Sequence, residues 1–369
     1  MIIRKDGHPS WRISSEKAEA YISIQGGMVT ADFKLGDRTV SPYYTLPWWN
    51  EEGAAGLDNL SQLLRGDFFC MPFGADIQED GSILYHGKPA HGFWMLKEKI
   101  SDSSVVLELE TDKGSIDKHI RLDGGNSLIY QNHIISGITD RTPMGYHPML
   151  KLPMEEGSGM VKLSGFAKGF TTPGLIEDAA GGGYSRIKPG IEIEDVTAVP
   201  CIDGSTLDLT RYPHASGFEE IVMFLNNPEE DFAYSCVAIP SERYLYFQLK
   251  NPAKLRNTIM WMSNGGRHYA PWSGRVKGLL GLEEITAFFH YGKEDSINEN
   301  FLTKLGYPTC VELKSEESLS VPLISGISEI GIDYSGVSRI EKHGDDSIVI
   351  IGNQGERNII KCDISYLRD

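Results

Sequence analysis

Apolar and polar residues alternate along much of the chain with a period of two, the spacing of a strand that buries one face. The clearest run lies at residues 105–134. There Leu107 and Leu109 alternate with Glu108 and Glu110, and turn sequences rich in Asp and Gly divide the run into three segments. This pattern predicts an antiparallel meander of three strands.

The same alternation predicts strands elsewhere in the chain. The further candidates are residues 21–24, 29–33, 191–193, 221–225, 232–239, 244–249, 259–262 and 285–291. Only residues 298–305 have the pattern of a helix, so the alternation of strand and helix that is typical of a parallel α/β sheet is missing. We therefore expect an all-β protein in which residues 10–295 form one large antiparallel β-sandwich.

The chain after residue 295 has a different character. Residues 296–369 contain the short helix, more polar loops and a hairpin that pairs residues 347–351 with residues 358–362. These residues form either a small C-terminal β extension or additional strands integral to the main sheets. The pattern leaves both arrangements open.

Composition excludes several classes of partner. The chain has 51 Asp and Glu against 35 Lys and Arg, and its formal net charge of −16 disfavours nucleic acid and anionic membranes as partners. No apolar stretch approaches the roughly 20 residues of a membrane span, and the first residues lack the apolar core of a secretory signal. We expect a cytoplasmic globular protein that binds a small molecule, with its oligomeric state open.

Neither a metal site nor a cofactor site is expected. The five cysteines lie far apart and form no Cys-x-x-Cys pair, and the histidines lack the spacing of a metal site, so we expect reduced thiols and no metal. The glycine run at residues 181–183 lacks the Gly-Lys-Ser/Thr ending of a phosphate-binding loop and is interpreted as a flexible loop.

Arg65 belongs to the first cluster of residues that could carry chemistry. It precedes an aromatic-rich segment broken by Pro and Gly, and two histidines, His86 and His91, follow, each directly before a glycine. The forked donor of an arginine and the faces of aromatic rings suit the hydroxyl groups and C–H faces of a sugar. The alternative is an arginine paired with a core carboxylate and histidines that cap turns.

His147 and Glu283 are the candidates for proton transfer. The proline after His147 restricts this histidine to extended backbone, as suits a general acid, although a structural histidine in the core is the alternative. Glu283 precedes the predicted strand at residues 285–291, where partial desolvation would raise the pKa of its carboxyl group and make it a better base. Two consecutive acids can also mark only a solvated turn.

Taken in order, these clusters resemble the aldose 1-epimerase (galactose mutarotase-like) superfamily, including its hexose-6-phosphate epimerase branch. The resemblance covers about residues 20–292. It rests on Arg65-Gly66, Pro72-Phe73-Gly74, His91-Gly92-Phe93, His147-Pro148 and Leu282-Glu283. It implies a large β-sandwich, the galactose mutarotase-like supersandwich, with a sugar site in a cleft on one face.

The resemblance also implies a reaction and a role for each residue. His147 would be the general acid at the ring oxygen and Glu283 the general base at the anomeric hydroxyl, so that ring opening interconverts the α and β anomers of an aldose. Arg65 and His91 would bind sugar oxygens, and His86 competes with His91 for its place. Each proton transfer is typically worth about 10²–10⁴-fold in rate, so this chemistry needs neither metal nor cofactor.

The sequence departs from the superfamily pattern in two places. Glu284 replaces the proline that usually follows the catalytic glutamate, which leaves the choice between Glu283 and Glu284 open. Glu219 is the counterpart of the substrate-binding aspartate, and Trp261 is a further candidate for substrate binding.

These departures keep two alternative functions in view. One is a non-catalytic carbohydrate-binding β-sandwich that retains the cleft. The other is an epimerase-like protein that acts on a phosphorylated or acidic sugar and binds its anionic group through Arg65, Arg267 or Arg275.

Overall fold

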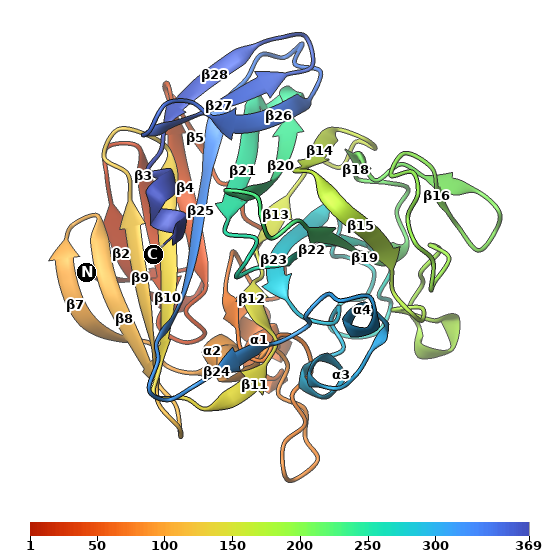
Figure 1. Cartoon of the computed structure of the whole chain (residues 1–369), viewed down its shortest axis with the longest axis horizontal. Helices are drawn as coiled ribbons and strands as arrows, with labels where there is room; N and C mark the ends of the chain where they lie inside the picture. Colours follow the sequence, from red (N-terminus) through yellow and green to blue (C-terminus); the bar gives the residue numbers. More distant parts are fainter. Residues whose placement is uncertain (369) are drawn as a thin grey trace.

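Antiparallel β-structure makes up most of the computed structural model, which describes residues 1–368 (Figure 1). A nine-stranded and a seven-stranded sheet enclose an apolar core to which the N-terminal sheet also contributes. The predicted all-β sandwich is therefore confirmed. The α-helices are α1 (Asn59–Leu63), α2 (Gly87–His91), α3 (Lys293–Ile297) and α4 (Phe301–Lys304). Within residues 1–368 no helix is long and apolar enough to cross a membrane.

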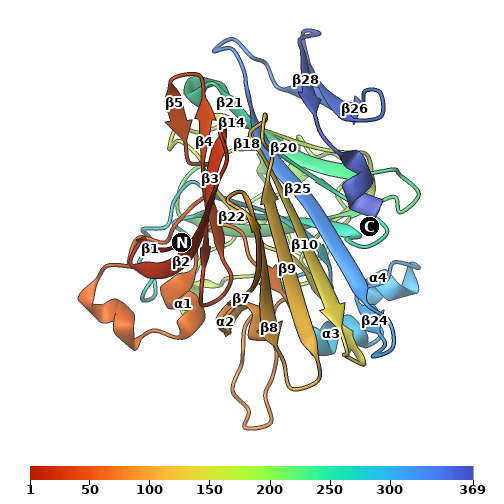
Figure 2. The same ribbon diagram turned by 90° about the vertical axis from the view of Figure 1, so that its left-hand side faces the viewer.

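The nine-stranded sheet has the order β18-β14-β20-β21-β25-β10-β9-β8-β7. Its strands are β7 (Met95–Ser101), β8 (Ser104–Glu110), β9 (Ser115–Leu122), β10 (Leu128–Ser136), β14 (Gly159–Leu163), β18 (Arg211–Tyr212), β20 (Ala233–Ile239), β21 (Tyr244–Lys250) and β25 (Leu319–Glu329). The meander predicted at residues 105–134 is β8, β9 and β10, which lie side by side in Figure 2.

The seven-stranded sheet has the path β15-β19-β22-β23-β12-β6, and β13 also pairs with β23. Its strands are β6 (Phe69–Cys70), β12 (Met144–Tyr146), β13 (Met149–Lys151), β15 (Phe166–Thr171), β19 (Phe218–Asn226), β22 (Asn257–Asn264) and β23 (Leu279–Thr286). The strand expected at residues 191–193 is not formed, and Glu192 makes only an isolated bridge to Phe170.

A five-stranded sheet at the N-terminus completes the sandwich (Figure 2). Its strands are β1 (Ile2–Lys5), β2 (His8–Ser14), β3 (Ala18–Ser23), β4 (Val29–Leu35) and β5 (Arg38–Val40). Shorter elements are β11 (Asp140–Thr142) with β24 (Val311–Leu313), β16 (Val199–Pro200) with β17 (Thr206–Leu207), and the 3-10 helices η1 (Glu52–Gly56), η2 (Ala179–Gly181), η3 (Pro240–Glu242) and η4 (Ile364–Arg368).

The chain after residue 295 takes part in two layers of the molecule. β25 lies inside the nine-stranded sheet, hydrogen-bonded to β10 on one side and β21 on the other. β26 (Val337–Lys342), β27 (Ser347–Gly352) and β28 (Arg357–Lys361) form a separate sheet that packs with η4 on the outer face of the nine-stranded sheet. Residues 10–295 alone would thus form the nine-stranded sheet without its inner strand β25. The division of the chain into two parts at residue 295 stays a prediction.

Both faces of the seven-stranded sheet are covered, which explains why its strands read as nearly continuous apolar runs. On β23, Leu280 and Leu282 belong to the core of the sandwich, whereas Leu279 and Ile285 point to the other side and contact a second apolar cluster. Side chains from α1 and α4 contribute to this second cluster. The helix expected at residues 298–305 is limited to α4, which begins after the capping residue Asn300.

Candidate active site

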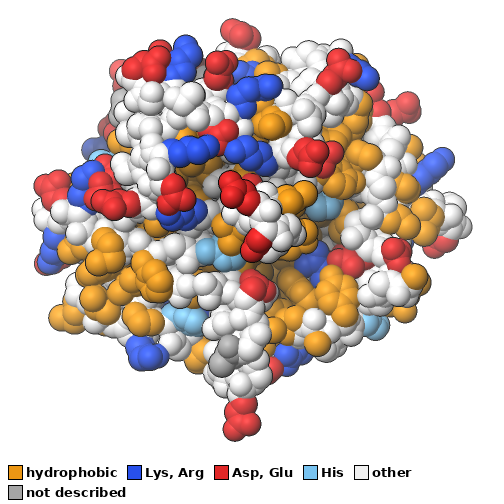
Figure 3. Space-filling view, turned by 90° about the horizontal axis from the view of Figure 1, so that it is seen from below, with side chains coloured by type: hydrophobic (Ala, Val, Ile, Leu, Met, Phe, Trp, Pro, Cys, Tyr) orange, Lys and Arg blue, Asp and Glu red, His pale blue; other side chains and the backbone are white. Residues whose placement is uncertain are grey.

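A cavity of about 460 Å³ opens on the outer face of the seven-stranded sheet. Its floor includes Ile221, Trp261 and Glu283 from β19, β22 and β23, and its walls come from α1 and neighbouring loops. A cavity of this size lies within the range of small-molecule sites. Figure 3 shows the molecule from below, where the surface is hollowed and apolar, acidic, basic and histidine side chains are interspersed.

His147 and Glu283 face each other in this cavity. The Nε2 atom of His147 lies 3.4 Å from Oε1 of Glu283, and the two side chains are only 7% and 4% exposed. The imidazole stacks on the ring of Phe68 with 4.7 Å between centroids, and the backbone N–H of His147 donates to the carbonyl of Phe68. Strand pairing and stacking therefore bring together two residues that are far apart in the sequence.

Burial shifts the pKa values of both groups toward their neutral forms. Desolvation raises the pKa of Glu283 well above its usual range and lowers the pKa of His147 to about 3. Such a pair holds one mobile proton, which resides on the carboxyl group or on the imidazole. It can therefore accept a proton at one atom while it delivers a proton from another.

The strand that carries Glu283 lies earlier in the chain than residues 285–291. β23 ends at Thr286, and Phe289 has a φ of +50°, in the left-handed region that ends an extended strand. Glu283 is therefore inside a paired strand, not at its start. Because successive side chains of a strand point to opposite faces, Glu283 and Glu284 cannot both reach the cavity.

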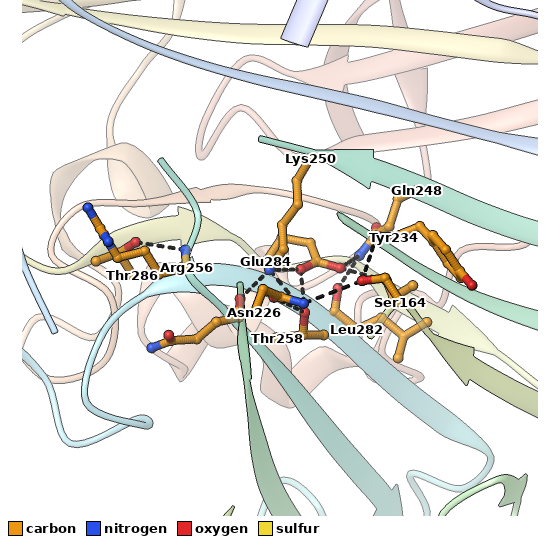
Figure 4. Close-up of polar contacts among 12 residues, drawn as sticks. Ser164, Asn226, Tyr234, Gln248, Lys250, Arg256, Thr258, Leu282, Glu284 and Thr286 are labelled. Carbon is orange, nitrogen blue, oxygen red and sulfur yellow. Dashed lines mark hydrogen bonds and ion pairs between the residues drawn. The ribbon is translucent and has the colours of Figure 1, made fainter. Parts of the chain in front are cut away.

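Glu284 points into the core of the sandwich (Figure 4). Its carboxylate lies 2.5 Å from Nζ of Lys250, and both side chains are almost completely buried. It also accepts hydrogen bonds from Ser235 (2.6 Å), Thr258 (2.7 Å) and Gln248 (2.8 Å). The geometry thus presents Glu283 to the cavity and commits Glu284 to a network that links the two large sheets.

Arg65 lies outside the cavity wall. Its Nε donates to the carbonyl of Leu63, and its Nη1 donates to the carbonyls of Lys5 and Asp6, with distances of 2.8, 3.1 and 3.1 Å. The side chain is 3% exposed and lies 3.8 Å from the Asp6 carboxylate. In this arrangement Arg65 joins the segment before β6 to the turn after β1, while its buried Nη2 group has no hydrogen-bond partner within residues 1–368.

Of the two competing histidines, the cavity wall contains His86 and not His91, although the local sequence favours His91. Nδ1 of His86 accepts from the backbone N–H of Gly74 at 3.3 Å, so the proton of the neutral ring is on Nε2, which can donate. The rings of His86 and His147 lie edge to face at 5.0 Å. His91 is the last residue of α2, and its Nε2 contacts the carbonyl oxygen of Tyr85 at 2.8 Å.

Trp261 lines the cavity, and Glu219 lies behind it. The indole N–H donates to Oε2 of Glu219 at 3.0 Å, and the Ser263 hydroxyl donates to Oε1 at 2.6 Å. Glu219 is 1% exposed, and desolvation raises its pKa. Glu219 therefore orients the indole, whose ring lies edge to face with His147 at 5.6 Å.

Several wall residues were not candidates from the sequence. They are Phe73, Glu177, Tyr269, Trp272 and His290. Phe73 belongs to the Pro-Phe-Gly motif, which could have drawn attention to it. Glu177 gives no sequence signal, because its partner Arg267 lies ninety positions later in the chain.

The described part of the chain, residues 1–368, contains no group of three or more His, Cys, Asp or Glu side chains that could hold a metal ion. All five cysteines are free thiols, and four of them are buried.

No protein-family model and no curated protein sequence matches this chain. Solved structures do match it. A protein from Escherichia coli K12, provisionally described as an aldose 1-epimerase, aligns with a TM-score of 0.59 at 14% identity over 87% of this chain and 99% of its own. A galactose mutarotase related enzyme from Lactobacillus acidophilus gives 0.55 at 10% identity, over 87% and 98%. The fold is galactose mutarotase-like.

A third galactose mutarotase-like structure gives the same result. It comes from Klebsiella pneumoniae subsp. pneumoniae, is provisionally described as an aldose 1-epimerase, and has a TM-score of 0.55 at 11% identity over 88% of this chain and 80% of its own. The fold implied by the sequence motifs is confirmed. At these identities the likeness establishes the galactose mutarotase-like fold alone, so the activity has to be argued from the cavity.

Proposed function

We propose that the protein is an aldose 1-epimerase-like isomerase that interconverts the α and β anomers of a sugar. The observation that carries the proposal is the contact between His147 and Glu283, 3.4 Å apart in a cavity of about 460 Å³. Their opposite pKa shifts leave one mobile proton on the pair. The galactose mutarotase-like fold supports the same conclusion.

Ring opening moves one proton from the anomeric hydroxyl to the ring oxygen while the bond between C1 and the ring oxygen breaks. With the proton of the pair on the imidazole, the Glu283 carboxylate accepts the hydroxyl proton and His147 protonates the ring oxygen. The pair then holds its proton on Glu283, and its total charge is unchanged. After rotation about C1–C2 the aldehyde recloses, with acid and base exchanged.

Neighbouring side chains hold this pair and offer contacts to a sugar. Phe68 and Trp261 pack against the imidazole of His147 and fix its plane. His86 supplies an Nε2–H donor in the cavity wall, and the exposed part of Trp261 offers an aromatic surface to the C–H face of a sugar ring.

Exchange NMR between the anomers of common aldoses tests the proposal. The wild type should accelerate exchange of at least one aldose above buffer, and Glu283→Gln and His147→Ala should each reduce that acceleration by about 10²-fold or more. Glu317→Gln, at an exposed position, is the matched control and should keep the wild-type rate. Full exchange in both variants of the pair would overturn the assignment.

A non-catalytic carbohydrate-binding role is the second candidate. The cavity and its aromatic wall are retained, but a glutamate, Glu219, stands in place of the substrate-binding aspartate and is held by Trp261 and Ser263, and Glu284 stands in place of the proline after Glu283. Calorimetric binding of a sugar by the wild type, with anomer exchange no faster than in buffer, would select this candidate over the isomerase.

A further inference from the structure

Glu177 and Arg267 form an ion pair in the cavity wall. Nε of Arg267 lies 2.7 Å from Oε1 of Glu177, and the arginine and glutamate side chains are 20% and 11% exposed. The guanidinium carbon lies 4.4 Å from the ring centre of Trp272 and 5.5 Å from that of Trp261. The Tyr269 hydroxyl donates to the same carboxylate oxygen at 2.9 Å. The charged fork is thus fixed between aromatic rings and a carboxylate.

Backbone pairing holds this arrangement in place. Gly183 and Arg267 form an antiparallel bridge, and backbone hydrogen bonds of 3.0 and 2.9 Å flank it. A Cβ atom at Gly183 would lie 2.2 Å from Oε2 of Glu177, so glycine at this position leaves room for the carboxylate. The glycine run that was interpreted as a flexible loop is therefore anchored beside the cavity.

The ion pair leaves groups available for a ligand. Of the Arg267 guanidinium, only the Nε–H donates a hydrogen bond to Glu177. The Nη1 and Nη2 groups of Arg267 make no hydrogen bond with any residue of the described chain. Oε2 of Glu177 accepts no hydrogen bond within the same residues. Donors and an acceptor side by side match two adjacent hydroxyl groups, each of which can both donate and accept.

The charges in and behind the cavity wall are unfavourable for an anion. Outside the His147–Glu283 pair, which shares one proton, the acidic side chains of the wall are Asp58 and Glu177, and Glu219 lies behind Trp261. Desolvation lowers the pKa of all three wall histidines, His86, His147 and His290, so these rings are neutral at pH 7. Among the described wall residues, Arg267 alone carries a full positive charge, and Glu177 already balances it. A phosphate would add a charge of about −1.5 to −2.

We propose that Glu177 is a specificity-determining residue of this cavity: with Arg267 it binds two adjacent hydroxyl groups of a neutral sugar and rejects sugars that carry a phosphate or carboxylate. This inference rests on the proposed sugar-binding function and adds the charge class of the ligand. It also decides between the neutral sugar and the phosphorylated or acidic sugar that the sequence left open.

Glu177→Gln tests the inference, because it removes the charge and nearly preserves the shape. Binding of glucose, galactose, glucose 6-phosphate and glucuronate is measured by calorimetry on the full chain. The wild type should bind a neutral sugar at least roughly ten-fold more tightly than its anionic counterpart. Glu177→Gln should strengthen binding of the anionic sugar by roughly ten-fold and weaken binding of the neutral sugar. Glu229→Gln, an exposed residue outside the cavity, removes the same charge and should change neither affinity.

Arg267→Lys is the second variant. It keeps the positive charge but loses the planar fork and its stacking on Trp272, so it should weaken binding of neutral sugars while the circular dichroism spectrum stays native. A wild type that prefers the 6-phosphate, or an unchanged preference in Glu177→Gln, would overturn the inference.

The outcomes separate this inference from the proposed isomerase activity. A change of preference in Glu177→Gln, without any anomer exchange by the wild type, would keep the inference and overturn the isomerase. If the wild type exchanges the anomers of a neutral aldose but Glu177→Gln leaves the binding preference unchanged, the isomerase would stand and the inference would be overturned. If the folded wild type binds none of the four sugars, both proposals are wrong for these substrates.

Discussion

Glu283 and Glu284 are consecutive residues of β23, and their carboxyl groups lie on opposite faces of the seven-stranded sheet. Oε1 of Glu283 lies 3.4 Å from Nε2 of His147 in the cavity, whereas Glu284 contacts Nζ of Lys250 at 2.5 Å between the two large sheets. The pleat of one strand thus gives two identical side chains different surroundings. Their replacements should have different consequences.

We expect Glu283→Gln to abolish chemistry and Glu284→Gln to lower stability. The first variant loses the proton acceptor, so anomer exchange should fall by about 10²-fold or more in a folded protein. The second leaves Lys250 buried without its counter-ion, which typically lowers the free energy of unfolding by about 3–5 kcal/mol. Exchange NMR and urea unfolding on both variants provide the measurement. The reverse pattern would show that Glu284 is the base.

Lys250→Met should destabilise the protein by a similar amount. The methionine fills most of the space of the lysine stem but leaves Glu284 as an uncompensated buried charge, at a cost of about 3–5 kcal/mol in the free energy of unfolding. In the double variant Lys250→Met/Glu284→Gln no charge is left, so its destabilisation should be well below the sum of the two single changes. A double-mutant cycle by urea unfolding measures this difference, and strict additivity would contradict the coupling.

The activity of the wild type should be retained at unusually acidic pH. In the proposed reaction the His147–Glu283 pair holds one proton, and it gains a second one only when His147 is protonated while Glu283 keeps its own. Because desolvation lowers the pKa of His147 to about 3, kcat/KM should fall as pH approaches 3 and not near the usual histidine value of about 6.5.

On the alkaline side of the same profile, kcat/KM should fall as the His147–Glu283 pair loses its last proton. Because the pKa of Glu283 is raised, this fall should occur at a pH above the range in which ordinary carboxyl groups titrate. The profile is measured by exchange NMR after subtraction of the buffer rate at each pH. An acidic limb centred near pH 6.5 would contradict the shift assigned to His147.

Glu283→Gln should be more stable than the wild type at alkaline pH. Folding raises the pKa of Glu283 above its unfolded value of about 4.3, so the folded state holds this proton more tightly. Protonated Glu283 therefore contributes favourably to the free energy of unfolding below about pH 4.3, and this contribution is lost as pH rises through the pKa of Glu283 in the folded protein. Glutamine cannot ionise, so its Tm advantage should grow between pH 5 and pH 8.

Thermal unfolding by circular dichroism at both pH values checks this prediction. The exposed variant Glu317→Gln serves as the control and should show a difference from wild type that does not vary with pH. A Tm advantage of Glu283→Gln that shrinks toward pH 8 would show that the carboxyl group is solvated in the folded protein.

Local patterns predicted many of the strands but not all of them, and not all of their limits; the strand expected at residues 191–193 is not formed. The meander at residues 105–134 follows directly from alternation, because each of its strands has one face in the core. The limits of β23 could not be predicted, since residues 285–291 are mostly apolar and contain none of the usual turn residues Gly, Pro, Asn or Asp. The strand ends at Thr286, and three residues later Phe289 adopts the left-handed region, which nothing in that residue's chemistry announces.

For the site, the motifs led to several residues that lie in or near one cavity, but they did not predict where each side chain points. His147 and Glu283 meet in the cavity, whereas Arg65 is not among its lining residues, and three backbone carbonyls accept hydrogen bonds from its guanidinium group. The carbonyl of Leu63 is two residues away in the chain, whereas those of Lys5 and Asp6 are brought to Arg65 only by the assembled fold. Glu177 could not be predicted for the same reason, since its partner is brought to it by a single β-bridge.

The position of β25 has a consequence for how the molecule is made. Its two neighbours, β10 and β21, have no shared hydrogen bonds in the finished sheet, and both need residues 319–329 between them. On a ribosome those residues emerge after the whole seven-stranded sheet has been synthesised. The nascent chain must therefore expose unpaired edges of β10 and β21 until late, so we expect it to fold slowly and to depend on holdase chaperones during synthesis.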